Sequence, residues 1–190
     1  MAVLGVKYAE FDGGMLYKGD LKGNPQKIVI HNSASAGNAF SSALYNYNKT
    51  MVEGLGTGFA HYYVDDNNII QLCRDNWVAW HSGKSEMNKM SIGIEICVNP
   101  MECYTKCKRG NCDKITTLCA KQEELIKRFF KAEQNAINLI HTLLAKWSLT
   151  PEDVIFHSDV KKTECPYFTK KLHNISRGAD FLTIFEKPNC

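Results

Sequence analysis

Two short apolar runs that each end in a histidine constrain the fold of this chain more than any other feature. They read Ile28-Val29-Ile30-His31 and Val154-Ile155-Phe156-His157. Consecutive β-branched and aromatic residues predict buried strands. A polar residue that ends such a strand lies at an edge of the sheet, where functional sites are assembled. The two runs therefore predict a sheet with two imidazoles at its edge.

Helical and strand patterns are mixed along the rest of the chain. Asn38 is the expected N-cap of the first helix, and Gly54 is its expected stop. The apolar spacing predicts helices over residues 38–52, 122–147 and 174–185, and strands over residues 59–64, 69–72 and 91–97. A chain of 190 residues is about one domain long. The mixture therefore indicates a single α/β domain over residues 1–190, with a central mixed β-sheet flanked by helices.

The predicted strand at residues 91–97 alternates strictly between two kinds of side chain. Isoleucines occupy positions 92, 94 and 96, whereas Ser91, Gly93, Glu95 and Cys97 occupy the positions between them. Successive side chains of a strand point to opposite faces of the sheet. Glu95 therefore leaves the isoleucine face and points toward whatever lies across the sheet.

The charge of the chain is mild, because 23 basic and 20 acidic residues give a net charge of +3. This balance does not indicate nucleic-acid binding, for which basic residues cluster on one face, but it is compatible with an anionic polymer as partner. No apolar run reaches the ~18–20 residues of a membrane helix. The N-terminus turns polar at Lys7, so we expect no signal peptide and a soluble protein made in the cytoplasm.

A possible metal site involves Cys165, which follows His157 by eight residues. Together with His31, these residues supply two imidazoles and one thiolate. They leave the fourth tetrahedral position of a zinc ion open, as in catalytic zinc sites. A single histidine at a strand end is usually structural, so the hypothesis depends on the three residues together. His141 and His173 lie outside these runs and are expected to face solvent.

Five motifs in order carry a resemblance to a known family. They are residues 28–33 (IVIHNS), 60–65 (AHYYVD), 77–83 (WVAWHSG), 91–96 (SIGIEI) and 156–160 (FHSDV) running through 163–166 (TECP). With them the chain resembles the zinc-dependent N-acetylmuramoyl-L-alanine amidases, a group that includes phage endolysins, wall-recycling amidases and peptidoglycan recognition proteins. The resemblance covers roughly residues 27–170.

The resemblance implies a zinc centre at the sheet edge, with His31, His157 and Cys165 as the metal ligands. It also places Glu95 where many members keep a glutamate. A carboxylate at this position suits a general base that takes a proton from water. The alternative for Glu95 is an ordinary salt-bridged carboxylate of a strand.

Four further residues receive roles from the same resemblance. His61 is expected to contact the attacking water or the oxyanion, and Thr163 is expected to donate a hydrogen bond to the oxyanion. Trp80 and His81 belong to a loop that lines the cleft, so they are expected to bind substrate. A core aromatic is an equally good interpretation of Trp80.

Residues 98–120 are an expected insertion that the resemblance does not explain. The insertion carries Cys103, Cys107, Cys112 and Cys119. These thiols are candidates for a second, structural zinc, although their spacing lacks the usual C-x2-C pairs. Free thiols and disulfides formed after release are the alternatives, because a reducing compartment keeps thiols reduced.

The resemblance implies hydrolysis of the amide between N-acetylmuramic acid and L-alanine in peptidoglycan, with one catalytic Zn²⁺. We expect the catalytic domain of a phage or prophage endolysin: a monomer that acts on the cell wall after release, without nucleic-acid binding or membrane insertion. Residues 187–190 are a candidate start of a linker. The alternatives are a cytoplasmic amidase that recycles muropeptides and a non-catalytic module that binds peptidoglycan.

Overall fold

The fold is described from a computed structural model of the chain. It covers residues 7–8, 19–33, 37–54, 58–100 and 115–186. Among these residues, no helix is both long enough and apolar enough to cross a membrane.

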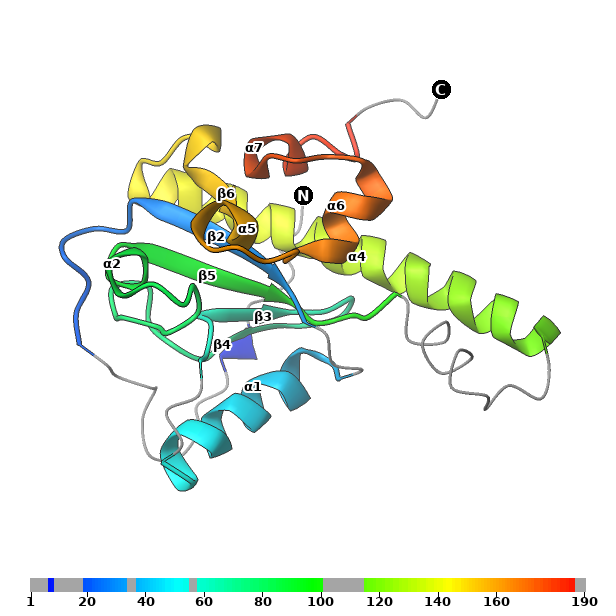
Figure 1. The fold of residues 1–190 in the computed structure, drawn as a ribbon, viewed down its shortest axis with the longest axis horizontal. Helices are drawn as coiled ribbons and strands as arrows, with labels where there is room; N and C mark the ends of the chain where they lie inside the picture. The colour runs from blue at the N-terminus through cyan, green and yellow to red at the C-terminus, as the bar shows by residue number, and fades with distance from the viewer. Residues whose placement is uncertain (1–6, 9–18, 34–36, 55–57, 101–114, 187–190) are drawn as a thin grey trace.

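Six strands form one mixed sheet (Figure 1). In spatial order they are β1 (Lys7–Tyr8), β4 (Ile69–Gln71), β3 (Tyr62–Val64), β5 (Ser91–Ile96), β2 (Lys27–Asn32) and β6 (Val154–Phe156). The pair β3 and β4 is antiparallel, and every other neighbouring pair is parallel. The predicted α/β fold with a central mixed sheet is therefore confirmed.

Helices cover both faces of this sheet. α1 (Ala39–Tyr47), which continues into a wider helical turn at Asn48–Val52, lies against one face, and α4 (Ile115–Trp147) runs along the other (Figure 1). The shorter helices are α2 (Ser85–Asn88), a 3-10 turn at Pro151–Asp153, α5 (His157–Val160), α6 (Tyr167–His173) and α7 (Gly178–Phe181).

The alternation of β2 and β5 divides the interior into two cores. The larger core lies on the α4 side and includes Ile28, Ile30, Ile92, Ile94, Ile96, Phe129, Ile140 and Phe156. The smaller core lies beneath α1 and includes Ala39, Ala43, Phe59, Tyr63 and Cys97. The isoleucines therefore fill the α4 side, as the alternation predicts, and the alternate residues of β5 are left for the α1 side.

The predicted helix ends are confirmed for α1, whereas α4 begins earlier than predicted. Asn38 caps α1 as predicted, because its side-chain oxygen accepts a hydrogen bond from the backbone N–H of Ser41 at 2.8 Å. Gly54 follows with a positive φ of 64°, which glycine adopts without strain. α4 begins at Ile115, before the predicted helix start at residue 122, and it overlaps the end of the predicted insertion at residues 98–120. The predicted helix over 174–185 is wrong, since only α7 forms there.

A buried carboxylate of α4 fixes the position of α6. Glu133 is fully buried; it accepts a hydrogen bond from the Thr169 hydroxyl at 2.7 Å and pairs with His173 Nε2 at 2.7 Å. The Thr169 hydroxyl in turn accepts a bond from the side-chain amide of Asn32 at the end of β2. His173 is therefore largely buried, and the expectation that it faces solvent is wrong, whereas His141 is exposed as expected.

Gly178 at the start of α7 provides a test of the packing between α7 and β6. A Cβ added here would overlap the backbone of β6, with the carbonyl carbon of Val154 at 2.6 Å. We expect Gly178→Ala to lower the free energy of unfolding by about 1–3 kcal/mol, as overpacking usually does. Urea unfolding measures the change, and Thr183→Ala on the exposed side of the same segment is the control. Equal stability of the two variants would show that α7 does not pack closely on β6.

Candidate metal and catalytic site

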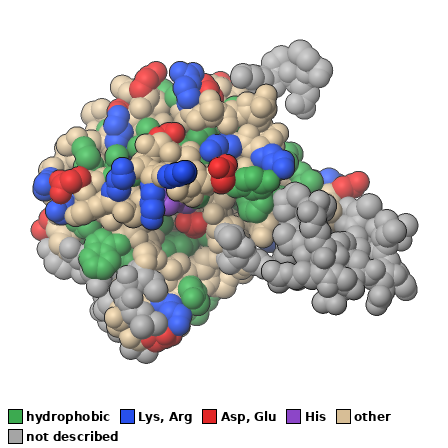
Figure 2. Space-filling view, in the orientation of Figure 1, with side chains coloured by type: hydrophobic (Ala, Val, Ile, Leu, Met, Phe, Trp, Pro, Cys, Tyr) green, Lys and Arg blue, Asp and Glu red, His purple; other side chains and the backbone are tan. Residues whose placement is uncertain are grey.

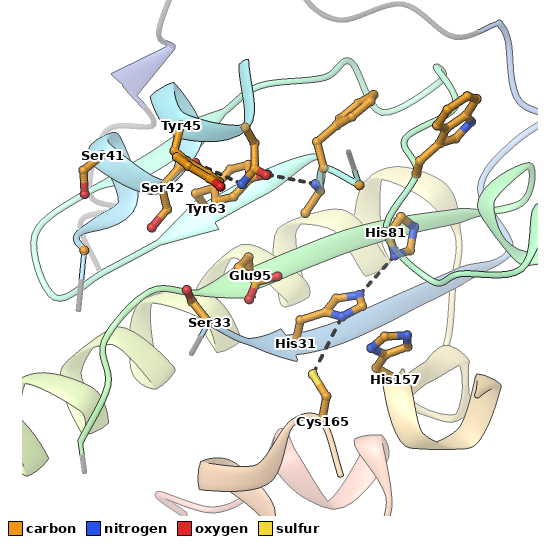
Figure 3. A pocket seen from close by; sticks show the side chains of 16 residues that line it. His31, Ser33, Ser41, Ser42, Tyr45, Tyr63, His81, Glu95, His157 and Cys165 are labelled. Atoms are coloured by element: carbon orange, nitrogen blue, oxygen red, sulfur yellow. Dashed lines mark hydrogen bonds between the residues drawn. The ribbon is translucent and has the colours of Figure 1, made fainter. Parts of the chain in front are cut away.

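One cavity of about 590 Å³ lies on the α1 side of the sheet (Figure 3). It is lined by strand ends, by one side of α1 and by the loops before β3 and α2. Its lining residues are His31, Ser33, Gly37, Ser41, Ser42, Tyr45, Asn46, Gly58, Phe59, Ala60, Tyr63, Trp80, His81, Glu95, His157 and Cys165.

The register of three neighbouring strands aligns the main polar groups of the cavity. His31 of β2 is paired with Glu95 of β5, and Glu95 is paired with Tyr63 of β3. Neighbouring strands lie about 4.8 Å apart, so the three side chains form a row across the sheet. His157 extends the row, because it follows Phe156, which is paired with Ile30 next to His31.

Three of these residues converge on one point. The side-chain nitrogens of His31 and His157 and the sulfur of Cys165 lie within 4.8 Å of one another. His31 Nδ1 lies 3.8 Å from the Cys165 sulfur, and the two imidazole rings lie 4.5 Å apart between centroids (Figure 3). The three residues come from β2, from the start of α5 and from the loop before α6, so the fold gathers them from distant parts of the sequence.

Hydrogen bonds leave the same nitrogen open on each histidine of this cluster. Nε2 of His157 donates to the backbone carbonyl of Ser82 at 3.0 Å. Nε2 of His31 lies 3.1 Å from Nδ1 of His81. Both rings therefore present Nδ1 to the cluster. Partners that fix the second nitrogen in this way are typical of metal-binding histidines.

The donor set fits a divalent cation such as zinc. Burial lowers the pKa of His31 to about 3 and also lowers the pKa of His157, so both imidazoles are neutral and have a free electron pair at neutral pH. Burial raises the pKa of the Cys165 thiol to about 12, but a coordinated cation deprotonates a thiol outright. Two nitrogens and one sulfur leave one of four tetrahedral positions open.

Glu95 is the carboxylate of the cavity. Within the part of the chain that the structure describes, its carboxylate makes no ion pair and accepts no hydrogen bond, and burial alone shifts its pKa, so the salt-bridged alternative finds no partner there. Burial raises the pKa of Glu95 to about 8. A cation at the neighbouring cluster would lower this pKa and favour the charged form. A half-buried, unpaired carboxylate beside a metal site has the properties of a general base.

Comparison with known proteins decides the family. The family model described as N-acetylmuramoyl-L-alanine amidase matches residues 21–168, which include His31, Glu95, His157 and Cys165. The chain belongs to the N-acetylmuramoyl-L-alanine amidase family.

Individual amidases and endolysins match over most of this chain. Endolysin PlyTW of Staphylococcus phage Twort is 29% identical over 156 residues, which are 79% of this chain and 28% of that protein. The amidase CwlA of Bacillus subtilis is 30% identical over 150 residues, which are 76% of this chain and 45% of that protein. This chain therefore spans less than half the length of these two curated relatives.

Solved structures of similar proteins share the fold of this chain. The catalytic domain of XlyA superposes with a TM-score of 0.60 at 28% identity, covering 85% of this chain and 86% of that one. The PlyG catalytic domain superposes with a TM-score of 0.67 and covers 97% of this chain and 99% of that one. At 21% identity, the likeness to PlyG shows the shared fold alone.

His61 does not line the cavity. Its ring is fully buried and is not among the lining residues of the cavity. Nδ1 accepts the backbone N–H of Gly93 at 3.0 Å, and Nε2 donates to the carbonyl of Trp77 at 2.8 Å. Burial lowers the pKa of His61 to about 4. The expectation that His61 contacts the attacking water or the oxyanion is therefore corrected. Both of its ring nitrogens bond to backbone groups, and neither reaches the cavity.

The remaining expected site residues, Thr163, Trp80 and His81, differ in their position relative to the cavity. Thr163 is not among the lining residues, and its hydroxyl accepts the backbone N–H of Cys165 at 3.3 Å. Trp80 lines the cavity with 43% of its surface exposed, so the structure places it at the mouth and not in a core. His81 lines the cavity too, but its ring nitrogens lie against His31 and Ser91.

Tyr63 is a cavity residue that the sequence did not single out. Its hydroxyl accepts the backbone N–H of Ala60 at 3.0 Å, and burial raises its pKa well above the usual value. Its sequence signal was the alternation of β3, in which Tyr62 and Val64 join the larger core and Tyr63 faces the other side.

The four cysteines expected to form a second metal site lie outside the described side chains. Cys103, Cys107 and Cys112 lie outside the described residues, and Cys119 lies in the first turns of α4, where side chains are not described. Among the cysteines whose side chains are described, Cys97 and Cys165 carry free thiols, and Cys73 is buried in the smaller core.

Proposed function

We propose that this chain hydrolyses the amide bond between the lactyl group of N-acetylmuramic acid and L-alanine in peptidoglycan, with one zinc ion held by His31, His157 and Cys165. One observation carries the proposal. An unpaired glutamate lies one strand away from an open three-ligand cluster, and both line the same cavity. This arrangement suits hydrolysis by water at a metal centre.

The residues of the cavity divide the work of the reaction. Zinc, when bound, supplies Lewis acidity for the carbonyl and lowers the pKa of water to about 7. Glu95 takes the proton from the attacking water and returns it to the nitrogen of the departing L-alanine. The Nε2 hydrogen bonds of His31 and His157 keep their rings fixed. Trp80 offers an exposed aromatic face to sugar or peptide at the mouth.

An endolysin that acts on the cell wall after release is the biological setting we propose, in the form of a monomeric catalytic domain. The match to Endolysin PlyTW supports this setting. Figure 2 shows basic side chains close to a histidine at the surface, with an acidic side chain beside it, and the basic side chains suit an anionic wall polymer. A non-catalytic binding module is less well supported, because all three ligands are present.

Metal content and product analysis on the same preparation test the proposal. One zinc per chain, with new L-alanine amino groups and no new reducing sugar from purified cell wall, is the expected result. New reducing ends would indicate cleavage of the glycan instead. Absence of both zinc and amine release would leave a binding module and overturn the proposal.

Removal of the metal should destabilise the protein. A ligand that binds only the folded state adds about 4 kcal/mol when its free concentration is 1,000 times its dissociation constant. For a chain of this length we expect chelation to lower Tm by about 8–16 °C. Zinc should restore Tm, and calcium should not, because calcium prefers oxygen ligands. An unchanged Tm in the chelated protein would contradict a zinc site in the folded state.

A further inference from the structure

We propose that His81 and Ser91 are positioning residues for the metal ligand His31, and that they set the zinc affinity of the site without binding substrate. The inference rests on the proposed zinc site, and it replaces the substrate-binding role expected for His81. Three hydrogen bonds and one glycine carry it.

The hydrogen bonds form a chain with only one consistent direction. It begins at the carbonyl of Met87, which can only accept, so the Ser91 hydroxyl donates its single proton there at 2.6 Å. The Ser91 oxygen must then accept from His81 Nε2, which lies 3.2 Å away. His81 Nδ1 is left without a proton and accepts from His31 Nε2 at 3.1 Å. The last consequence is that Nδ1 of His31 carries a free electron pair, on the side of Cys165.

Gly93 makes room for this chain. An added Cβ at this position would lie 2.5 Å from Cγ of His81, so the imidazole lies directly over the strand at Gly93. His61 holds the backbone of Gly93 in turn. The backbone N–H of His61 donates to the carbonyl of Gly93, and Nδ1 of His61 accepts the backbone N–H of Gly93. The alternate residues of β5 therefore act in order along one face: Ser91 orients His81, Gly93 admits its ring, and Glu95 faces the cavity.

The two histidine ligands are fixed by different means. His157 donates to a main-chain carbonyl, that of Ser82, which no side-chain substitution removes directly. His31 depends on the side chains of His81 and Ser91. The structure therefore predicts that zinc affinity is sensitive to His81 and Ser91, although neither residue is among the proposed ligands.

Zinc affinity and steady-state kinetics of three variants test the inference. We expect His81→Leu to weaken zinc binding by about 10–100-fold, the usual effect of losing a partner of a metal ligand. Its KM, measured at saturating zinc, should stay within about twofold. His81→Asn should recover much of the affinity, because the amide oxygen can accept from His31 in place of Nδ1. Ser91→Ala should cost about 2–10-fold, the range of one hydrogen bond.

Two control variants separate this role from the alternatives. His141→Leu changes an exposed histidine of α4 and should alter neither quantity. Trp80→Ala, at the mouth, should raise KM and leave zinc affinity unchanged. A raised KM with unchanged zinc affinity in His81→Leu would mean that His81 contacts substrate, and it would overturn the inference. If the unsubstituted protein itself bound no zinc, the proposed function would be overturned instead.

Long-range ¹H–¹⁵N NMR of the zinc-loaded protein provides a readout independent of activity. We expect the proton of His81 on Nε2, and Ser91→Ala should allow part of the population to carry it on Nδ1. A proton on Nδ1 of His81 in the unsubstituted protein would contradict the direction of the chain.

Discussion

Replacement of Cys165 by serine should abolish both zinc binding and wall hydrolysis. A hydroxyl is a far poorer zinc ligand than a thiolate, and the two remaining imidazoles do not complete the three-ligand set of a catalytic site. Metal centres contribute several kcal/mol to stabilising such transition states. At 1.36 kcal/mol for each factor of ten, we expect activity to fall by at least about 10³-fold.

The measurement is zinc per chain by elemental analysis, together with amine release from purified wall. Cys73→Ser is the matched control, since it makes the same chemical change at a buried thiol of the smaller core. That variant should lose some stability and keep its zinc. Full zinc occupancy and activity in Cys165→Ser would remove Cys165 from the proposed ligand set.

Glu95→Gln should separate catalysis from metal binding. Glutamine keeps the shape of the side chain but cannot accept a proton, and general base catalysis typically contributes about 10²–10⁴-fold to the rate. We expect kcat to fall within that range while zinc stoichiometry stays at one per chain. Glu86→Gln, which changes an exposed glutamate of α2, should keep full activity. Turnover of Glu95→Gln within a few-fold of the unsubstituted protein would make Glu95 structural.

The same substitution should stabilise the metal-free protein at alkaline pH. Burial raises the pKa of Glu95 to about 8 from its ordinary value of 4.5, so the folded chain holds this proton more tightly than the unfolded chain. The stability contributed by the protonated form is complete below pH 4.5 and is lost as pH rises through 8. Glutamine does not ionise, so the gain in stability of Glu95→Gln should grow over that interval. Urea unfolding of the chelated proteins at pH 5 and pH 8.5 measures it.

Local patterns in the sequence were sufficient to predict where the central residues of the candidate site lie in the sheet. The alternation of side chains along residues 91–97 predicted that Glu95 lies on the sheet face opposite the isoleucines. The two runs that end in His31 and His157 proved to be neighbouring strands. These predictions succeeded because strand periodicity and strand ends are local properties of the chain.

The surrounding residues could not be assigned in the same way. The partners of His61 are backbone atoms of Trp77 and Gly93, which only the folded chain brings to its ring. The role of His81 depends likewise on Ser91 and His31, which approach it in three dimensions. His173 looked exposed because its partner Glu133 lies 40 residues earlier, on another helix.

The strand pairing also has a consequence for how the protein is made. A chain grows from its N-terminus, so β2 and His31 emerge from the ribosome early, whereas β6, His157 and Cys165 are synthesised more than 120 residues later. β6 is the strand that completes the sheet beside β2. A nascent chain shorter than 165 residues therefore lacks at least one of the three proposed zinc ligands. The proposed activity therefore requires synthesis through Cys165, and zinc uptake by a growing chain would report the moment at which its sheet closes.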